Sequence, residues 1–453
     1  MTLLPFVLPS RRRLSIYIGT ILIFLLFHMF LGSLLDLPNL FEEAKAVQHQ
    51  YNGEGKQGGP CDLYDGLENI FVIIRTGSNE LHEKLPSILN STMLCVPHYG
   101  IWSDWEETYS GHHIANTLDE IDPDLLAYHS DFDYYRRLQE GGPDGFSSDE
   151  ITSWRHAPNT NLGRNTPAWK LDKWKFLPLA KKAYAQSPLS PWYMFIECDT
   201  YVFWDSLLNW LVHFDHSQLF YIGRQMNMGD SLFAYGGAGI IVSNPAMRML
   251  VERYTSNEKL YNEFTISQWA GDVVLGKVMS DAGIGLSKAS PTLEGDMPAT
   301  LDFRSTSSTG HPSWCYYATT YHHMSPYDIA LYYEFEQFWK STNADFPRNG
   351  DVFRHLVYPA MSSEALDWDN LSNDIATEDA SFEECLRICE ARPDCVQFSL
   401  SSRTCKTSNI AKLGSKQEQP SAEHVHSGWI KRRVEAIMNV NEASCSGQQW
   451  ILP

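Results

Sequence analysis

The chain has 453 residues and is 43% hydrophobic, so it can bury a large core and form two or three globular units, and disorder throughout is excluded. Its formal net charge of −20 would repel a phosphate backbone, so nucleic acid is not an expected partner. Aromatic residues make up 13% of the chain, including 14 Trp, which favours flat surfaces that stack on sugars or bases.

The N-terminal segment has the pattern of a membrane anchor. Residues 14–35 form an uncharged, mainly apolar stretch that is long enough to span a bilayer. Arginines precede this stretch and acids follow it, which predicts a cytosolic tail over residues 1–13 and a luminal remainder. A cleaved signal peptide is the alternative, but its apolar core would be shorter. We therefore expect a single-pass type II membrane protein.

The next segments predict a stem followed by an alternating α/β domain. Residues 36–60 are rich in Gly and polar residues and predict a flexible stem. The apolar run 70–74, an amphipathic segment and a second run near 92–96 predict strand, helix and strand. The runs 219–223 and 239–242 predict further strands, and a helix should start at Asn244-Pro245. We expect this domain to cover residues 61–345.

A separate module is predicted over residues 346–453, where the composition changes to small polar residues and cysteines. Cys385 and Cys389 would share one face of a helix capped by Ser381, and Cys395 and Cys405 surround a short strand. Two disulfides could then join the helix to that strand. Zinc is the alternative, which the luminal setting and the cysteine spacing disfavour.

Other candidate modifications fit the same compartment. Cys61 and Cys95 flank the first predicted strand and helix, so a disulfide between them is expected, and Cys315 and Cys445 are a second candidate pair. Asn90 and Asn370 each begin a glycosylation triplet.

The run Trp192–Ile196 leads directly into two acids, Glu197 and Asp199. An apolar run of this length predicts a buried strand, and α/β proteins place ligand-binding side chains at the ends of such strands. Two carboxylates there can hold a divalent cation and the diphosphate that it neutralises. A solvated loop is the alternative for the acids by themselves.

Three motifs follow one another in an informative order. Asp199-Thr200-Tyr201-Val202, Tyr235-Gly236-Gly237-Ala238-Gly239-Ile240-Ile241-Val242-Ser243 and Gly271-Asp272-Val273-Val274-Leu275-Gly276 together resemble glycosyltransferase family 31, in its Fringe-like and core 1 galactosyltransferase-like branch of fungal type. The resemblance covers residues 61–340, and the tail over 350–440 resembles a PAN/apple module. A GT-A fold, a UDP-sugar donor, Mn²⁺ and inversion of the anomeric carbon are what the resemblance implies.

The resemblance implies the metal ligands. The acids of the family's D-x-D motif fall on Glu197 and Asp199, so the first is a Glu in this chain and Asp199 is the better ligand. Cys198, between them, is interpreted as a buried thiol because Mn²⁺ prefers carboxylate and imidazole. The family's metal-binding histidine falls in Tyr321-His322-His323-Met324, and we assign it to His322. A histidine that only forms hydrogen bonds within the domain is the alternative.

The same resemblance makes Asp272 the catalytic base, since it opens a predicted helix that would keep its carboxylate ionised. A plain helix cap is the alternative. For the donor nucleotide we expect Arg75, Thr76 and Asp104, which follow the first strands, with Lys173 near the diphosphate and Gly236 and Gly237 close to the donor. For these glycines, tight packing explains the pattern equally well, and for Lys173 a solvated helix face does so.

The sequence thus predicts a metal-dependent, inverting enzyme of the Golgi or endoplasmic reticulum membrane. It would move a hexose or N-acetylhexosamine from a UDP-sugar to a glycan or glycoprotein, in β-1,3 linkage. A membrane protein that binds carbohydrate or protein through an inactive domain of the same fold is the alternative, which the altered first acid of D-x-D favours. Retention of Asp199, Asp272 and His322 favours the enzyme.

Overall fold

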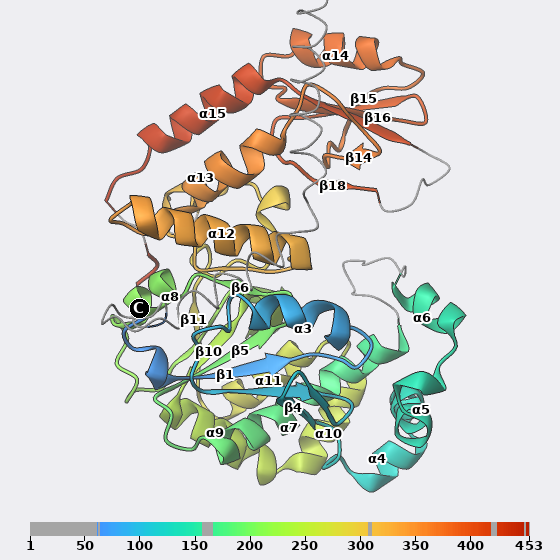
Figure 1. Ribbon diagram of the computed structural model, residues 1–453, viewed down its shortest axis with the longest axis vertical. Helices are drawn as coiled ribbons and strands as arrows, with labels where there is room; N and C mark the ends of the chain where they lie inside the picture. The colour runs from blue at the N-terminus through green and yellow to red at the C-terminus, as the bar shows by residue number, and fades with distance from the viewer. Residues whose placement is uncertain are drawn as a thin grey trace, which may run out of the picture. The chain divides into compact units, whose positions relative to one another are not determined.

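The central sheet contains strands that are apolar on both faces. β1 (Ile70–Arg75) and β5 (Trp192–Glu197) are buried almost throughout, because helices cover both faces of the sheet in the computed structural model (Figure 1). The strand order is β11-β7-β10-β5-β1-β2-β4-β3. The remaining strands are β2 (Tyr99–Ser103), β3 (Glu107–Tyr109), β4 (His112–Asn116), β7 (Tyr221–Gly223), β10 (Ile240–Ser243) and β11 (Leu286–Lys288).

The order of parallel strands creates a single polar edge. β4, β2, β1 and β5 run parallel, whereas β10 is antiparallel to both of its neighbours. The carboxyl ends of β1 and β5 therefore lie side by side, with Arg75 opposite Glu197 in register. Ligands bind at this edge in open α/β sheets, so it is where a site is expected.

Alternate residues of β1 enter two different cores. Ile70, Val72 and Ile74 pack with helices α3 (Leu81–Leu89), α8 (Trp204–Leu211) and α12 (Pro326–Thr342). Phe71 and Ile73 pack with α7 (Pro167–Gln186), α9 (Asn244–Thr255) and α11 (Gly271–Asp281). The period of two along a strand thus produces a three-layer arrangement of helix, sheet and helix, the mixed α/β class that the sequence predicts.

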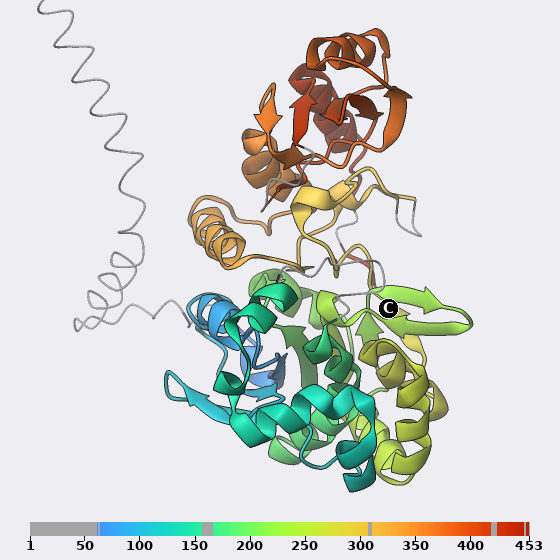
Figure 2. The same cartoon turned by 90° about the vertical axis from the view of Figure 1, so that its right-hand side faces the viewer.

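Helices and a hairpin border the sheet (Figure 2). The helices form a third apolar cluster with the start of α7, and they are α4 (Pro123–Tyr128), α5 (Asp133–Gly141) and α6 (Ser148–Arg155). The hairpin pairs β8 (Gln225–Met228) with β9 (Ser231–Ala234). Helix α10 (Glu258–Ser267) ends shortly before α11.

The C-terminal module is an antiparallel sheet with a helix joined to it by disulfides. Helix α14 (Phe382–Ala391) begins at Ser381, which forms a capping box with Glu384. Two disulfides, Cys385–Cys405 and Cys389–Cys395, connect α14 to the chain on either side of β16. The sheet order is β13-β19-β16-β17-β15, with β13 (Ala365–Leu366), β15 (Asp374–Thr377), β16 (Gln397–Ser401), β17 (Thr404–Ser408) and β19 (Val425–Trp429).

The boundary predicted near residue 345 crosses a shared core. Phe303 and Trp314, from before the boundary, pack in one cluster with Val396 and Trp429, from after it. A disulfide joins Cys315 to Cys445, and α15 (Lys431–Ala443) leads to the second of these cysteines. The described residues from Tyr64 onward accordingly belong to one compact unit.

The structure describes residues 61, 64–155, 166–306, 310–417, 424–447 and 450–452. The predicted tail, anchor and stem over residues 1–60 lie outside these ranges. Within them, no helix is both long and apolar enough to cross a membrane. Cys61 and Cys95 are both disulfide-bonded.

Two sequence predictions are corrected by the fold. The predicted strand near residues 92–96 is a series of turns after α3. The amide of Leu94 donates to the carbonyl of Ser91, and the amide of Val96 donates to the carbonyl of Met93. This run is apolar because Met93 and Val96 enter the core. Asn370, a predicted glycosylation site, is 0% exposed and donates to the carbonyls of Phe398 and Gly428. A glycan therefore cannot be attached to it in the folded protein, whereas Asn90 is exposed.

Candidate active site

A small β-ribbon brings the acids after β5 next to a distant histidine. β6 (Tyr201–Val202) pairs antiparallel with β12 (Thr320–Tyr321). The amide of Met324 also donates to the carbonyl of Asp199, at 3.1 Å. These backbone bonds hold residues 322–324 against residues 197–199, so the side chains of Asp199 and His322 meet although they are far apart in sequence.

The charges at this point are close together and buried. Nε2 of His322 lies 3.1 Å from Oδ1 of Asp199 and 3.4 Å from Oε2 of Glu197. Burial alone would lower the pKa of His322, but the two carboxylates raise this pKa to about 10. Burial alone would likewise raise the pKa of Asp199, but His322 and Lys84 hold it well below its usual value. Nζ of Lys84 is 2.8 Å from Oδ2 of Asp199.

The side chains of Asp199, His322 and His323 fit a divalent cation. One ligand atom from each lies within 4.8 Å of the others, and Nε2 of His322 is buried without a hydrogen bond of good geometry among the described residues. His323 has a φ of 60°, an uncommon conformation outside glycine that places its ring beside that of His322. Oxygen and imidazole nitrogen together suit Mn²⁺.

Glu197 and Cys198 are less suited to direct metal contact. One carboxylate oxygen of Glu197 is paired with Arg75. Cys198 is a buried free cysteine, and burial raises the pKa of its thiol to about 12, so it stays neutral. Its placement agrees with the interpretation as a buried thiol.

Arg75 occupies the centre of the sheet edge. It forms ion pairs with Asp172 of α7 and with Glu197, and its guanidinium lies 4.2 Å from the ring centre of Phe176. Ion pairs on two sides and an aromatic ring fix the guanidinium in one orientation. Arg75 thus connects β1, β5 and α7 where the predicted donor site lies.

Asp272 is the second residue of α11 and is only 7% exposed. Its Oδ2 accepts from the amide of Gly236 at 3.1 Å, and its Oδ1 accepts from the amide of Val273. Burial raises its pKa to about 6, against the lowering effect of the Gly236 amide and Arg75. The predicted ionised carboxylate is therefore present at neutral pH, but with a basicity suited to accepting a proton.

The structure gives both glycines of the central motif a packing reason. A Cβ on Gly237 would lie 2.1 to 2.6 Å from ring atoms of His322. A Cβ on Gly236 would lie 3.1 Å from Phe176. The backbone thus approaches the imidazole and α7 closely, which is the packing alternative for these glycines.

The predicted donor-binding residues divide into two groups. Thr76 and Asp104 lie beside Arg75 at the sheet edge, but Asp104 is completely buried and 3.2 Å from Nζ of Lys175. The prediction that Lys173 lies near the diphosphate is wrong. Its ammonium pairs with Asp131 at 2.8 Å and donates to the carbonyls of Ile266 and Gln268. It is almost buried there, so it does not offer a free charge to a diphosphate.

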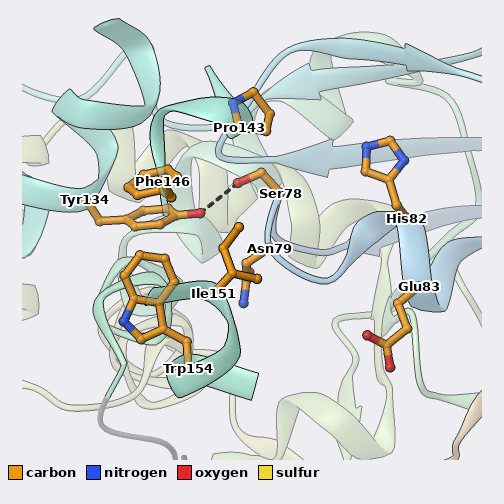
Figure 3. A pocket seen from close by; sticks show the side chains of 9 residues that line it. All are labelled: Ser78, Asn79, His82, Glu83, Tyr134, Pro143, Phe146, Ile151 and Trp154. Carbon is orange, nitrogen blue, oxygen red and sulfur yellow. Dashed lines mark hydrogen bonds between the residues drawn. The ribbon is translucent and has the colours of Figure 1, made fainter. Parts of the chain in front are cut away.

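A pocket with an aromatic wall opens beside the start of α3 (Figure 3). Tyr134 and Phe146 stack on each other with Trp154 at their edge, and the hydroxyl of Tyr134 lies 3.0 Å from that of Ser78. His82 of α3 lies on the opposite side. Ser78 follows Arg75 and Thr76 closely, so this pocket borders the sheet edge.

Sequence reasoning missed three contributors to the site. His323 lies next to the predicted ligand His322, and the repeated histidine is the sequence feature that points to it. Tyr235, whose hydroxyl lies 3.2 Å from Nδ1 of His322, stood at the start of the glycine motif. No sequence feature points to Lys84 as part of the site, because a lysine on an amphipathic helix normally faces water.

Part of the chain matches a known protein family. Residues 176–294 match the family model described as Fringe-like, and this match indicates a glycosyltransferase and supports the resemblance to family 31. The matched segment contains Asp199, the glycine motif and Asp272, whereas His322 and the C-terminal module lie beyond it. No curated protein matches the chain.

Proposed function

We propose that the protein is a metal-dependent, inverting glycosyltransferase with a GT-A fold. It would transfer a hexose or N-acetylhexosamine from a UDP-sugar to a hydroxyl of a glycan or glycoprotein, forming a β-1,3 linkage. The observation that carries this proposal is the convergence of Asp199, His322 and His323 at the carboxyl end of β5, a strand of the Fringe-like segment. Asp272, in the same segment, supplies the matching carboxylate.

In this proposal Asp199, His322 and His323 hold Mn²⁺, with Glu197 beside them. The bound ion would neutralise the diphosphate as the sugar leaves. An overall acidic protein needs local cations to bind an anionic donor, and Arg75 and Lys84 lie at the sheet edge, although both are paired with carboxylates there. When the cation takes over Asp199, Lys84 would keep its second ion pair, with Glu80 at 2.8 Å.

Asp272 acts as the base. The acceptor oxygen forms a bond to the anomeric carbon while the bond from that carbon to UDP breaks, and UDP leaves with the electron pair. The acceptor proton passes to the carboxylate of Asp272. One displacement with one base inverts the anomeric carbon.

The remaining sequence expectations complete the proposal. An anchor over residues 14–35 would place the enzyme in the Golgi or endoplasmic reticulum membrane as a type II protein. The disulfides of the described residues suit a luminal environment. The C-terminal module would be of PAN/apple type.

Release of UDP by the purified full chain tests the proposal. UDP-galactose, UDP-glucose and UDP-N-acetylglucosamine should be compared with and without Mn²⁺. We expect release from one donor that needs the metal and falls at least about a hundred-fold in Asp199→Ala, but not in the exposed control Asp144→Ala. Equal turnover by Asp199→Ala, or none with any donor and a broad acceptor panel, contradicts it. Absent turnover with retained glycan binding would favour the inactive binding protein.

A further inference from the structure

Two tryptophans from separate elements stack on each other. The rings of Trp169 and Trp269 are 5.9 Å apart and inclined by 19°. Trp169 lies in the first turn of α7, where Thr166 caps the helix by accepting from the amide of Trp169. Trp269 lies in the connection from α10 to α11 and is 37% exposed. Part of the Trp269 ring is therefore accessible to a ligand.

This pair is close to the proposed chemistry. Trp269 precedes Asp272 by three residues. On α7, Trp169, Asp172 and Phe176 are spaced three and four apart, so they follow one face of the helix. Asp172 pairs with Arg75, and Phe176 packs against Arg75 and Gly271. The helical rise places Trp169 about 10 Å along α7 from Phe176.

The loop that carries Trp269 is held firmly. Nζ of Lys173, which is almost buried, donates to the carbonyls of Ile266 and Gln268, just before Trp269. The same ammonium pairs with Asp131. The indole Nε1 of Trp269 also donates to the sulfur of Met228 in the β8–β9 hairpin. A buried charge that fixes an exposed aromatic ring is the arrangement of a preorganised binding surface.

We propose that the Trp169–Trp269 pair is the acceptor platform, which binds a pyranose ring of the acceptor glycan and delivers a hydroxyl to Asp272. This inference rests on the proposed function. The C–H groups on one face of a pyranose are apolar and pack on an indole, while the ring hydroxyls remain at the edges for polar contacts. Lys173 is a positioning residue in this arrangement.

Binding of simple glycosides tests the platform directly. Saturation-transfer NMR with methyl glycosides of galactose, mannose and N-acetylglucosamine should be recorded on the full chain. We expect transfer to the ring C–H protons of at least one glycoside. The signal should fall at least five-fold in Trp269→Ala and in Trp169→Ala, and be restored largely in Trp269→Phe.

Tyr128→Ala is the matched control, because it removes an exposed aromatic ring from α4. Unchanged melting temperatures establish that the variants are folded. Equal transfer in Trp269→Ala and the parent overturns the platform, and so does absence of binding by every glycoside. Donor hydrolysis by the parent separates the two proposals. Hydrolysis without glycoside binding removes the platform only. Glycoside binding without turnover of any donor removes the enzyme and the acceptor role of the tryptophan pair, and leaves a glycan-binding surface.

Discussion

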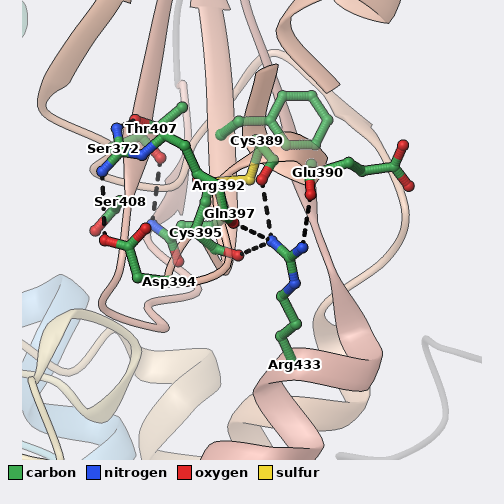
Figure 4. The surroundings of a disulfide bond; sticks show 12 residues. Ser372, Cys389, Glu390, Arg392, Asp394, Cys395, Gln397, Thr407, Ser408 and Arg433 are labelled. Carbon is green, nitrogen blue, oxygen red and sulfur yellow. Dashed lines mark hydrogen bonds and ion pairs between the residues drawn. A yellow bond between two sulfur atoms is a disulfide. The ribbon is translucent and has the colours of Figure 1, made fainter. Parts of the chain in front are cut away.

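Two charged sites in this protein, one half-buried and one buried, differ in how completely their polar atoms are paired. In the C-terminal module, the guanidinium of Arg433 donates to the carbonyls of Cys389, Glu390, Arg392 and Cys395 at 2.7 to 3.0 Å (Figure 4). These carbonyls lie at the end of α14 and in the turn after it, where a helix leaves its last acceptors unpaired. Arg433 thus adds charge-assisted hydrogen bonds to these carbonyls, two of which, those of Cys389 and Arg392, also accept from backbone amides.

At the sheet edge, by contrast, Asp199 and Glu197 lie against one imidazole, and Nε2 of His322 has no well-aligned hydrogen bond among the described residues. Glu197 is already paired with Arg75 and Asp199 with Lys84, so the atom that a bound cation would give a partner is Nε2 of His322. The comparison teaches that a charged group serves stability where its hydrogen bonds are complete, and can serve binding where a polar atom still lacks an aligned partner.

Removal of the proposed base should have the largest effect. Asp272→Asn cannot accept the acceptor proton, so we expect kcat to fall about a thousand-fold while UDP-sugar binding, measured by calorimetry, is retained. A variant that keeps kcat would show that Asp272 only organises the backbone around Gly236.

The parent's pH profile is the control for that variant. Because burial raises the pKa of Asp272 to about 6, the reactive carboxylate is lost as pH falls through 6. The parent's kcat/KM should therefore fall tenfold per pH unit below about pH 6 and level off above it. The residual activity of Asp272→Asn should lack this step.

Crowding of the metal site gives a smaller effect. The methyl group in Gly237→Ala would collide with His322, so the imidazole must move away from Asp199. We expect Mn²⁺ affinity to fall by about ten- to a hundred-fold, measured by calorimetry. Gly285→Ala is the control, since its Cβ would meet nothing within 4 Å. An unchanged affinity for Mn²⁺ in Gly237→Ala would show that the His322 imidazole is not a metal ligand.

Removal of the Arg433 guanidinium should lower the stability of the protein. Arg433→Ala removes four hydrogen bonds to carbonyls, of which only those of Cys389 and Arg392 also accept from a backbone amide outside α14, so we expect the free energy of unfolding in urea titration to fall by about 2 kcal/mol. Arg432→Ala removes an exposed neighbouring charge and should be neutral. If both variants had the same free energy of unfolding, the hydrogen bonds of Arg433 at the end of α14 would contribute nothing to stability.

The sequence predicts those parts of the site that depend on the helix or strand in which a residue lies. Asp199 follows a buried strand and Asp272 opens a helix, so both could be recognised from the segments around them. The cysteines of the module were recognisable for the same reason, since Cys385 and Cys389 share a helix face and each is now in a disulfide. The α/β class likewise follows from the alternation of apolar runs.

Long-range pairing decided the rest. Lysine residues on an amphipathic helix normally face water, yet Lys84 contacts Asp199 and Lys173 holds the loop of Trp269. Asn370 belongs to a surface motif but is buried under β16 and β19. A sequence pattern reports which side of its own helix or strand a residue occupies. Which distant segment covers that side is fixed only when the elements pack, because their contacts depend on the whole core.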